Sequence, residues 1–322
     1  MRYNNLPGTS LKVSELSLGT MMFGAQTGEA DSLSILDCAY GRGVNFWDTA
    51  DMYNQGESER IVGKALKGRR GDVILATKVA NQMGSGINDR GLSRRNIINA
   101  LDASFKRLDT DYVDLYYMHT PDYETDIEET LETMSNLVIQ GKIRYVGVSN
   151  YAAWQVADML AACDRRGYIA PVISQNVYNA ITRGVETEMV PFLLAHGMGM
   201  SVYNPIAGGL LAGKHKPGKP AGDTRFGQNA IYFNRYWSDD NFGAVEKLTE
   251  IAKAHGMGLL QLALKWCAGR PGVTSVISGV SKLAQIEQNI ELMEGEALPE
   301  SATAACDEVW RTLSGARYGY NR

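Results

Sequence analysis

The sequence has few cysteines, no long apolar run and no excess of positive charge. Its four cysteines stand far apart and form no CxxC pair, which argues against a disulfide framework or a zinc site. No run of about 18 apolar residues occurs, and the first residues, Met-Arg-Tyr-Asn-Asn, form no apolar signal region. With 32 basic and 36 acidic residues, the net charge of −4 offers no basic face for a nucleic acid. We therefore expect a cytoplasmic protein without a membrane, nucleic-acid or metal partner.

Also missing are a GxGxxG motif, a low-complexity segment and a break in composition. A doubly wound dinucleotide-binding sheet usually carries the Gly-rich motif after its first strand, so its absence disfavours that fold. A chain of 322 residues can bury roughly three quarters of the surface that its unfolded form exposes. The sequence therefore predicts a single domain over residues 1–322.

Short apolar runs typical of strands alternate with amphipathic stretches typical of helices. Strict alternation implies parallel strands joined by helical crossovers, and eight such units indicate a (β/α)8 TIM barrel. A β-hairpin is expected before them, over residues 3–13, and the longest irregular stretch, residues 215–239, is expected to be a functional or mobile loop. Strands are predicted at 15–18, 44–47, 73–77, 112–118, 143–148, 172–175, 200–203 and 275–277. Helices are predicted at 31–42, 58–66, 93–108, 126–140, 152–165, 186–196, 242–267 in two parts, and 283–291.

Four polar side chains follow the second, third and fourth predicted strands: Asp48, Tyr53, Lys78 and His119. Barrel enzymes carry their chemistry where strands end, so these side chains are expected to share one site. Reducing a carbonyl needs a proton at oxygen, which Tyr53 could donate, and a hydride, which requires a cofactor. An ordinary tyrosine has a pKa of about 10. A Lys78 ammonium nearby is predicted to lower that pKa, with Asp48 holding the lysine and His119 orienting the carbonyl.

Each of the four residues also has a simpler interpretation. Asp48 could cap a turn, Tyr53 could be an aromatic residue of the barrel rim, and Lys78 could be a solvated charge. His119 could be a histidine of the core. Taken singly, these alternatives are as good as the catalytic ones, but four polar groups at successive strand ends favour a shared site.

Six stretches of the sequence resemble the aldo-keto reductases, and most closely the bacterial branch that also resembles the potassium-channel β subunits. The similarity runs from about residue 1 to residue 310 and has high specificity. The stretches are 18–21, 48–53, 77–78, 114–119, 141–150 and 203–214.

The resemblance implies a barrel that binds NADPH without a Rossmann fold and reduces a small-molecule carbonyl substrate. It implies Tyr53 as the acid, Lys78 and Asp48 as the groups that tune it, and His119 as the group that orients the carbonyl. A second function remains possible, an NADP-binding regulatory subunit that senses redox state with little turnover. His119 favours catalysis, because the channel subunits typically lack that histidine.

The resemblance also assigns residues to the cofactor. Ser149, Asn150 and Gln175 match the positions that hold the nicotinamide carboxamide, and Tyr203 matches the aromatic residue that stacks on the nicotinamide ring. Residues 277–289 match the segment that binds the adenosine end. Backbone amides of the Gly-rich segment 204–214 are expected near the pyrophosphate, with Lys214 and Arg225 adding positive charge. The helix N-terminus after Gly279 suits a phosphate, and Lys282 is expected to face the 2′-phosphate, which favours NADPH over NADH. The positions matched to cofactor contacts are Gly19, Thr20, Met21, Asp48, Ser149, Asn150, Gln175, Tyr203, Asn204, Pro205, Ile206, Ala207, Gly209, Lys214, Arg225, Gly279, Ser281, Lys282, Gln285, Gln288 and Asn289.

Several of these assignments have alternatives. Asn150 could be the N-cap of the next helix, and segment 204–214 could be a surface loop with solvated cations. Ser281 could likewise be a plain N-cap and Lys282 a surface charge. Gln288 stands where the family usually has glutamate against the adenine amino group, so that contact loses its charge. The substrate, the oligomeric state (a homo-oligomer is possible) and the role of the tail, residues 315–322, are left open.

Overall fold

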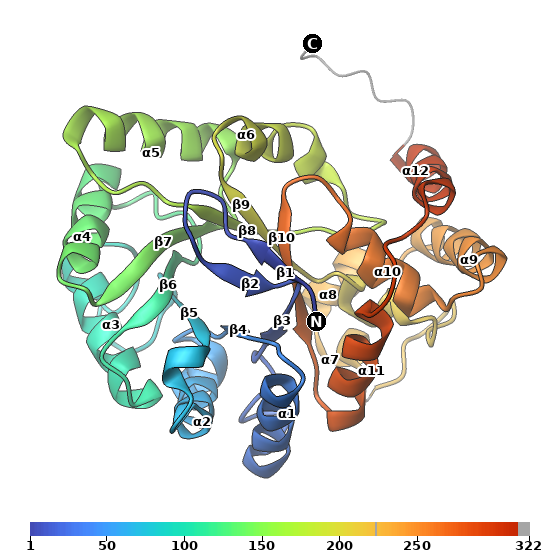
Figure 1. Ribbon diagram of the computed structural model, residues 1–322, viewed down its shortest axis with the longest axis horizontal. Coiled ribbons are helices and arrows are strands. Elements are labelled where there is room, and N and C mark those ends of the chain that lie inside the picture. Colours follow the sequence, from blue (N-terminus) through green and yellow to red (C-terminus); the bar gives the residue numbers. More distant parts are fainter. Residues whose placement is uncertain (223, 315–322) are drawn as a thin grey trace.

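The protein is a closed barrel of eight parallel strands surrounded by helices, which confirms the predicted (β/α)8 fold (Figure 1). The computed structural model describes residues 1–222 and 224–314, so the C-terminal tail lies outside the described residues. Hydrogen bonds join the strands in the order β10-β3-β4-β5-β6-β7-β8-β9. The strands are β3 (Leu16–Gly19), β4 (Phe46–Asp48), β5 (Ile74–Val79), β6 (Val113–Met118), β7 (Ile143–Ser149), β8 (Ile173–Val177), β9 (Gly199–Tyr203) and β10 (Val273–Gly279).

The predicted N-terminal hairpin is present and closes one end of the barrel. Strands β1 (Tyr3–Asn5) and β2 (Lys12–Ser14) pair antiparallel and cross the barrel in Figure 1. Leu6 and Val13 are fully buried and pack with barrel-interior residues such as Phe46. Apolar side chains fill this end of the barrel. The polar side chains that could form a site therefore lie at the other end, where the strands finish.

The helices begin and end largely where the sequence signals are. The Ser93 side chain accepts a hydrogen bond from the Asn96 amide at the start of one helix, and Asp126 caps the next in the same way. No helix within residues 1–222 or 224–314 is long and apolar enough to cross a membrane. The helices are α1 (Glu29–Gly41), α2 (Glu57–Leu66), α3 (Arg94–Leu108), α4 (Ile127–Ile139), α5 (Ala153–Arg166), α6 (Met189–Ala195), α7 (Arg225–Gln228), α8 (Ala230–Tyr236), α9 (Asp239–Ala254), α10 (Leu259–Ala268), α11 (Leu283–Met293) and α12 (Glu300–Ser314).

Three helices in the last third of the chain, α7, α8 and α12, were missed by the sequence analysis. Residues 215–239 are not irregular throughout, since they contain α7 and α8, capped by the side chains of Thr224 and Asn229. Helices of four and seven residues are too short to show a helical period in the sequence. Helix α12 was not predicted, and an ion pair of 2.6 Å between Arg183 and Asp307 ties it to the loop after β8.

Candidate active site

Inward-facing positions at the ends of neighbouring strands carry the polar side chains. Side chains alternate between the two faces of a strand. Asp48 comes two positions after the barrel-interior residue Phe46, and Lys78 two positions after Ala76, another interior residue. His119 directly follows β6, and its backbone amide extends the ladder to β5. The alternation of side chains that places apolar groups inside the barrel therefore also places these polar groups at its mouth, the end where the strands finish.

Lys78 is fully buried and binds three oxygens. Its Nζ lies 2.7 Å from Asp48 Oδ2, 2.7 Å from the Thr49 carbonyl and 3.2 Å from the Tyr53 hydroxyl. Burial by itself lowers the pKa of Lys78, but the charges of Asp48 and Tyr53 raise that pKa above its ordinary value. The side chain is therefore an ammonium ion, and the interpretation as a solvated charge is wrong.

A left-handed turn brings the tyrosine back over the barrel mouth. The turn Tyr53–Gly56 contains Asn54 and Gln55 at φ 50° and 54°, a region that non-glycine residues seldom adopt. The Asn54 side-chain amide donates to the carbonyls of Met21 (3.0 Å) and Phe23 (2.6 Å). These bonds offset the cost of the turn and join it to the segment after β3.

The pKa of Tyr53 is shifted in the direction opposite to the one expected. Burial raises the pKa of the phenol, the Lys78 ammonium lowers it by a smaller amount, and the Asp48 charge raises it again. The net pKa lies above the ordinary value of 10.0, so the expectation of a lowered pKa was wrong. At neutral pH the group is a protonated phenol beside a cation, which suits an acid that is stabilised after losing its proton.

His119 is a neutral ring beside this phenol. Burial and the charge of Lys78 lower the pKa of His119 to about 3. The Asn81 side-chain nitrogen lies 3.1 Å from Nδ1, and an amide nitrogen can only donate, so Nδ1 accepts and the ring proton sits on Nε2. The ring packs edge-on against Tyr53, with centroids 6.0 Å apart. Sequence reasoning missed Asn81, because a loop asparagine gives no signal of its own.

Four residues predicted to hold the nicotinamide lie together beside Asp48. The Gln175 side-chain amide donates to Asp48 Oδ1 at 2.8 Å, and the Ser149 hydroxyl donates to the Gln175 carbonyl at 3.0 Å. The Asn150 amide donates to Ser149 Oγ at 3.0 Å, and its oxygen accepts from the Tyr203 hydroxyl at 2.7 Å. Asn150 does not cap α5, whose N-cap lies two residues further along, so that alternative is wrong.

The Gly-rich segment after β9 forms a tight turn, Ala207–Ala212. The amides of Ala207, Gly209 and Leu211 already donate to carbonyls within the segment, which leaves fewer amides for a phosphate than the sequence implied. The Asn204 side-chain nitrogen is buried and has no partner among the described residues. An unsatisfied buried donor in this segment is compatible with a ligand that accepts from it.

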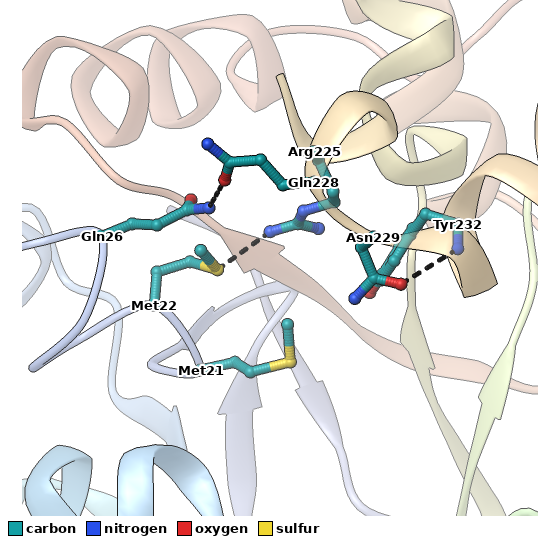
Figure 2. Close-up of a pocket in the computed structure, with 7 residues that line it drawn as sticks. All are labelled: Met21, Met22, Gln26, Arg225, Gln228, Asn229 and Tyr232. Carbon is teal, nitrogen blue, oxygen red and sulfur yellow. Dashed lines mark hydrogen bonds between the residues drawn. The ribbon is translucent and has the colours of Figure 1, made fainter. Parts of the chain in front are cut away.

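A cavity of about 190 Å³ lies between the segment after β3 and the helices α7 and α8, and Figure 2 shows its lining. The Arg225 guanidinium points into it, stacks 4.9 Å from the centre of the Tyr232 ring and contacts Met22 Sδ at 3.0 Å. Within residues 1–222 and 224–314, Arg225 forms no ion pair, and neither does the exposed Lys214. A cation that faces a cavity without a carboxylate fits an anionic group of a ligand.

The segment predicted to hold the adenosine end surrounds the start of α11. Gln285 Oε1 accepts from the backbone amides of Ser281 (2.8 Å) and Lys282 (3.2 Å), so both amides are already bonded and Lys282, not Ser281, is the N-cap. Asn289 is buried and donates to Ser278 Oγ at 2.9 Å. Lys282 forms no ion pair with any described residue. The exposed members of this group are Gly279, Lys282 and Gln288.

The chain is similar to known proteins over most of its length. Residues 15–311 match the profile of the Aldo/keto reductase family. A probable voltage-gated potassium channel subunit beta of Arabidopsis thaliana is 40% identical over 301 residues, covering 91% of this chain and 92% of the relative. The human aflatoxin B1 aldehyde reductase member 2 is 37% identical over 316 residues, covering 92% and 86%. An uncharacterized oxidoreductase of Bacillus subtilis (strain 168) is 36% identical over 305 residues, covering 91% of both chains.

Proposed function

Since the chain belongs to the aldo/keto reductase family, we propose that it reduces an aldehyde or ketone to an alcohol with NADPH, with Tyr53 as the proton donor. The observation that carries the proposal is the hydrogen-bonded chain at the barrel mouth. Tyr53 contacts Lys78 at 3.2 Å, and Lys78 contacts Asp48 at 2.7 Å. Carbonyl reduction needs a proton donor of this kind next to a group that stabilises the anion left behind.

The proposed roles follow from charge and burial. The carbonyl oxygen accepts a hydrogen bond from His119 Nε2 and the proton from the Tyr53 hydroxyl, and the resulting phenolate is stabilised by the Lys78 ammonium. Asp48 keeps Lys78 charged and is itself held by Gln175. His119 does not compete for the proton, because an imidazole with a pKa of about 3 stays neutral at physiological pH.

The cofactor supplies the hydride when bound, and several residues of the chain suit it. Ser149, Asn150 and Gln175 offer amide and hydroxyl groups beside Asp48 for the nicotinamide carboxamide, and Tyr203 offers a ring to stack against. Arg225 offers a cation in the cavity of Figure 2 for the phosphates. Lys282 is proposed to select NADPH over NADH through the 2′-phosphate.

A second candidate function is a regulatory subunit that binds NADP and turns over little. It is favoured by the 40% identity to a protein described as a probable voltage-gated potassium channel subunit beta. The two functions share the fold and the cofactor residues, so turnover distinguishes them.

The test is NADPH oxidation by the purified protein with 4-nitrobenzaldehyde, followed by a panel of aldehydes and ketones. We expect turnover that Tyr53→Phe lowers by at least about 10²-fold with NADPH binding retained. Tyr112→Phe is the matched control and should keep full activity. Tyr112 directly precedes β6, so it lies at the end of the barrel opposite the proposed site. If the panel gives no turnover, the reductase is rejected in favour of the regulatory subunit. If Tyr53→Phe stays active, the proton donor is misassigned.

A further inference from the structure

The first turn of α2 reaches the ends of three successive strands. Ser58 is fully buried, and its Oγ lies 2.7 Å from Thr20 Oγ1 and 3.0 Å from Thr49 Oγ1. The next residue, Glu59, is also fully buried and accepts a hydrogen bond of 2.6 Å from Thr77 Oγ1. The three threonines follow or belong to β3, β4 and β5, so two adjacent helical residues bind the outer face of three strand ends.

Glu59 carries a buried charge that is fully paired. Its second oxygen lies 2.6 Å from Arg107 Nε on α3. The Arg107 side chain lies directly under Gly56, where an added Cβ would come within 2.5 Å of its Cδ. Gly56 ends the turn that begins at Tyr53, so the same ion pair supports the backbone that carries the phenol.

These contacts bear on the backbone that holds the reacting groups. Thr20 Oγ1 also contacts the Asp48 carbonyl at 3.1 Å, and the Thr49 carbonyl is one of the three oxygens bound by Lys78. Thr77 is the residue before Lys78, and its side chain points outward where Lys78 points inward. A shift of α2 would therefore move both the phenol and its ammonium partner.

We propose that Ser58 and Glu59 are positioning residues that hold Asp48, Lys78 and Tyr53 at reacting distance, an inference that rests on the proposed function. Neither side chain belongs to the hydrogen-bonded chain at the mouth: Ser58 acts through Thr20 and Thr49, and Glu59 acts through Thr77 and Arg107. A buried ion pair is weak evidence for stability, since an apolar replacement is often as stable, so we assign placement as the role. Misplacement of about 1 Å can cost up to about 100-fold in rate.

The test compares variants that remove or keep the outward hydroxyl on β5. Thr77→Val should lower kcat for NADPH-dependent aldehyde reduction by about tenfold while the Kd for NADPH, measured by fluorescence, stays unchanged. Thr77→Ser restores the hydroxyl and should recover most of the lost kcat. Ser58→Ala, an independent variant on the helix, should lower kcat in the same way.

Thr130→Val is the matched control. Thr130 is buried on α4, and its hydroxyl donates to the Leu92 carbonyl at 2.9 Å, a bond that involves neither α2 nor a residue bonded to Lys78. It should lose a similar hydrogen bond without loss of kcat. Wild-type kcat in both Thr77→Val and Ser58→Ala, or an equal loss in Thr130→Val, overturns the positioning role. If the wild-type protein reduces no carbonyl, the proposed function fails and the inference fails with it.

Discussion

Asp51→Asn is expected to change how stability depends on pH. Asp51 is 1% exposed, and neither of its carboxylate oxygens bonds another side chain within the described residues. Burial and the nearby charge of Glu59 raise the pKa of Asp51 from 3.8 to about 7, although the Met52 backbone amide and the charges of Arg107 and Lys78 oppose the shift. The folded protein therefore holds this proton more tightly than the unfolded chain does.

The sign and the size of this pH effect on the free energy of unfolding follow from the linkage between protonation and folding. A raised pKa means that stability is fully present below pH 3.8 and is lost as the pH rises through about 7. A shift of roughly three units is worth on the order of 4 kcal/mol in all, at about 1.4 kcal/mol per unit. Between about pH 5 and pH 8 the expected loss is about 2–3 kcal/mol, because part of the titration lies below that window. Asparagine has nearly the same shape and does not titrate, so the variant should lack this loss.

The assay is urea unfolding of both proteins at several pH values between about 5 and 8. The two proteins should have the same m-value, so that a change in the midpoint reports a change in the free energy of unfolding. The free energy of unfolding of the variant, relative to wild type, should rise by about 2–3 kcal/mol across this window. Asp158→Asn, which removes an exposed carboxylate on α5, controls for the change in net charge. A difference between Asp51→Asn and wild type that stays constant with pH would refute the assignment of a buried, protonated Asp51.

Three further predictions need different measurements. Lys282→Ala should weaken NADPH binding by about tenfold and leave NADH binding unchanged, because only NADPH carries the 2′-phosphate; equal losses in titrations with the two cofactors would remove Lys282 from that role. The profile of kcat/KM against pH should show no step from His119 between about pH 5 and 9, and a step in that range that vanishes in His119→Gln would contradict the neutral imidazole. Gly147→Ala should lower the free energy of unfolding by about 1–3 kcal/mol, because its Cβ would lie 2.5 Å from the Tyr117 ring, whereas Gly184→Ala, with open space around it, should cost little in the same urea assay.

Local sequence signals located most of the barrel and the chain position of its polar groups. All eight strands overlap the predicted runs, because each strand is a short apolar segment between turn residues. The positions of Asp48, Lys78 and His119 at strand ends were likewise visible in the sequence. The short helices α7 and α8 were not, since one or two helical turns carry too few residues to show a period.

The electrostatic balance at Tyr53 could not be predicted from residue types. The sequence predicts that Lys78 lies near Tyr53 and lowers the pKa of the phenol, and this effect of Lys78 is present. Burial acts in the opposite direction and is larger, and burial depends on side chains contributed by distant parts of the chain. The same holds for Asn81, which contacts His119 across 38 positions of sequence.

The sequence by itself therefore determined the strand and helix order, the closed parallel barrel and the residues that stand at its mouth, because each depends on local periodicity and chain order. Only the tertiary structure decided which groups are buried, which are ionised and which are held in place. Ser58 and Glu59 read as ordinary residues of a predicted helix, yet folding sets them against threonines on three strands. Contacts between elements far apart in the chain leave no periodic trace, and the charge states at the site depend on those contacts.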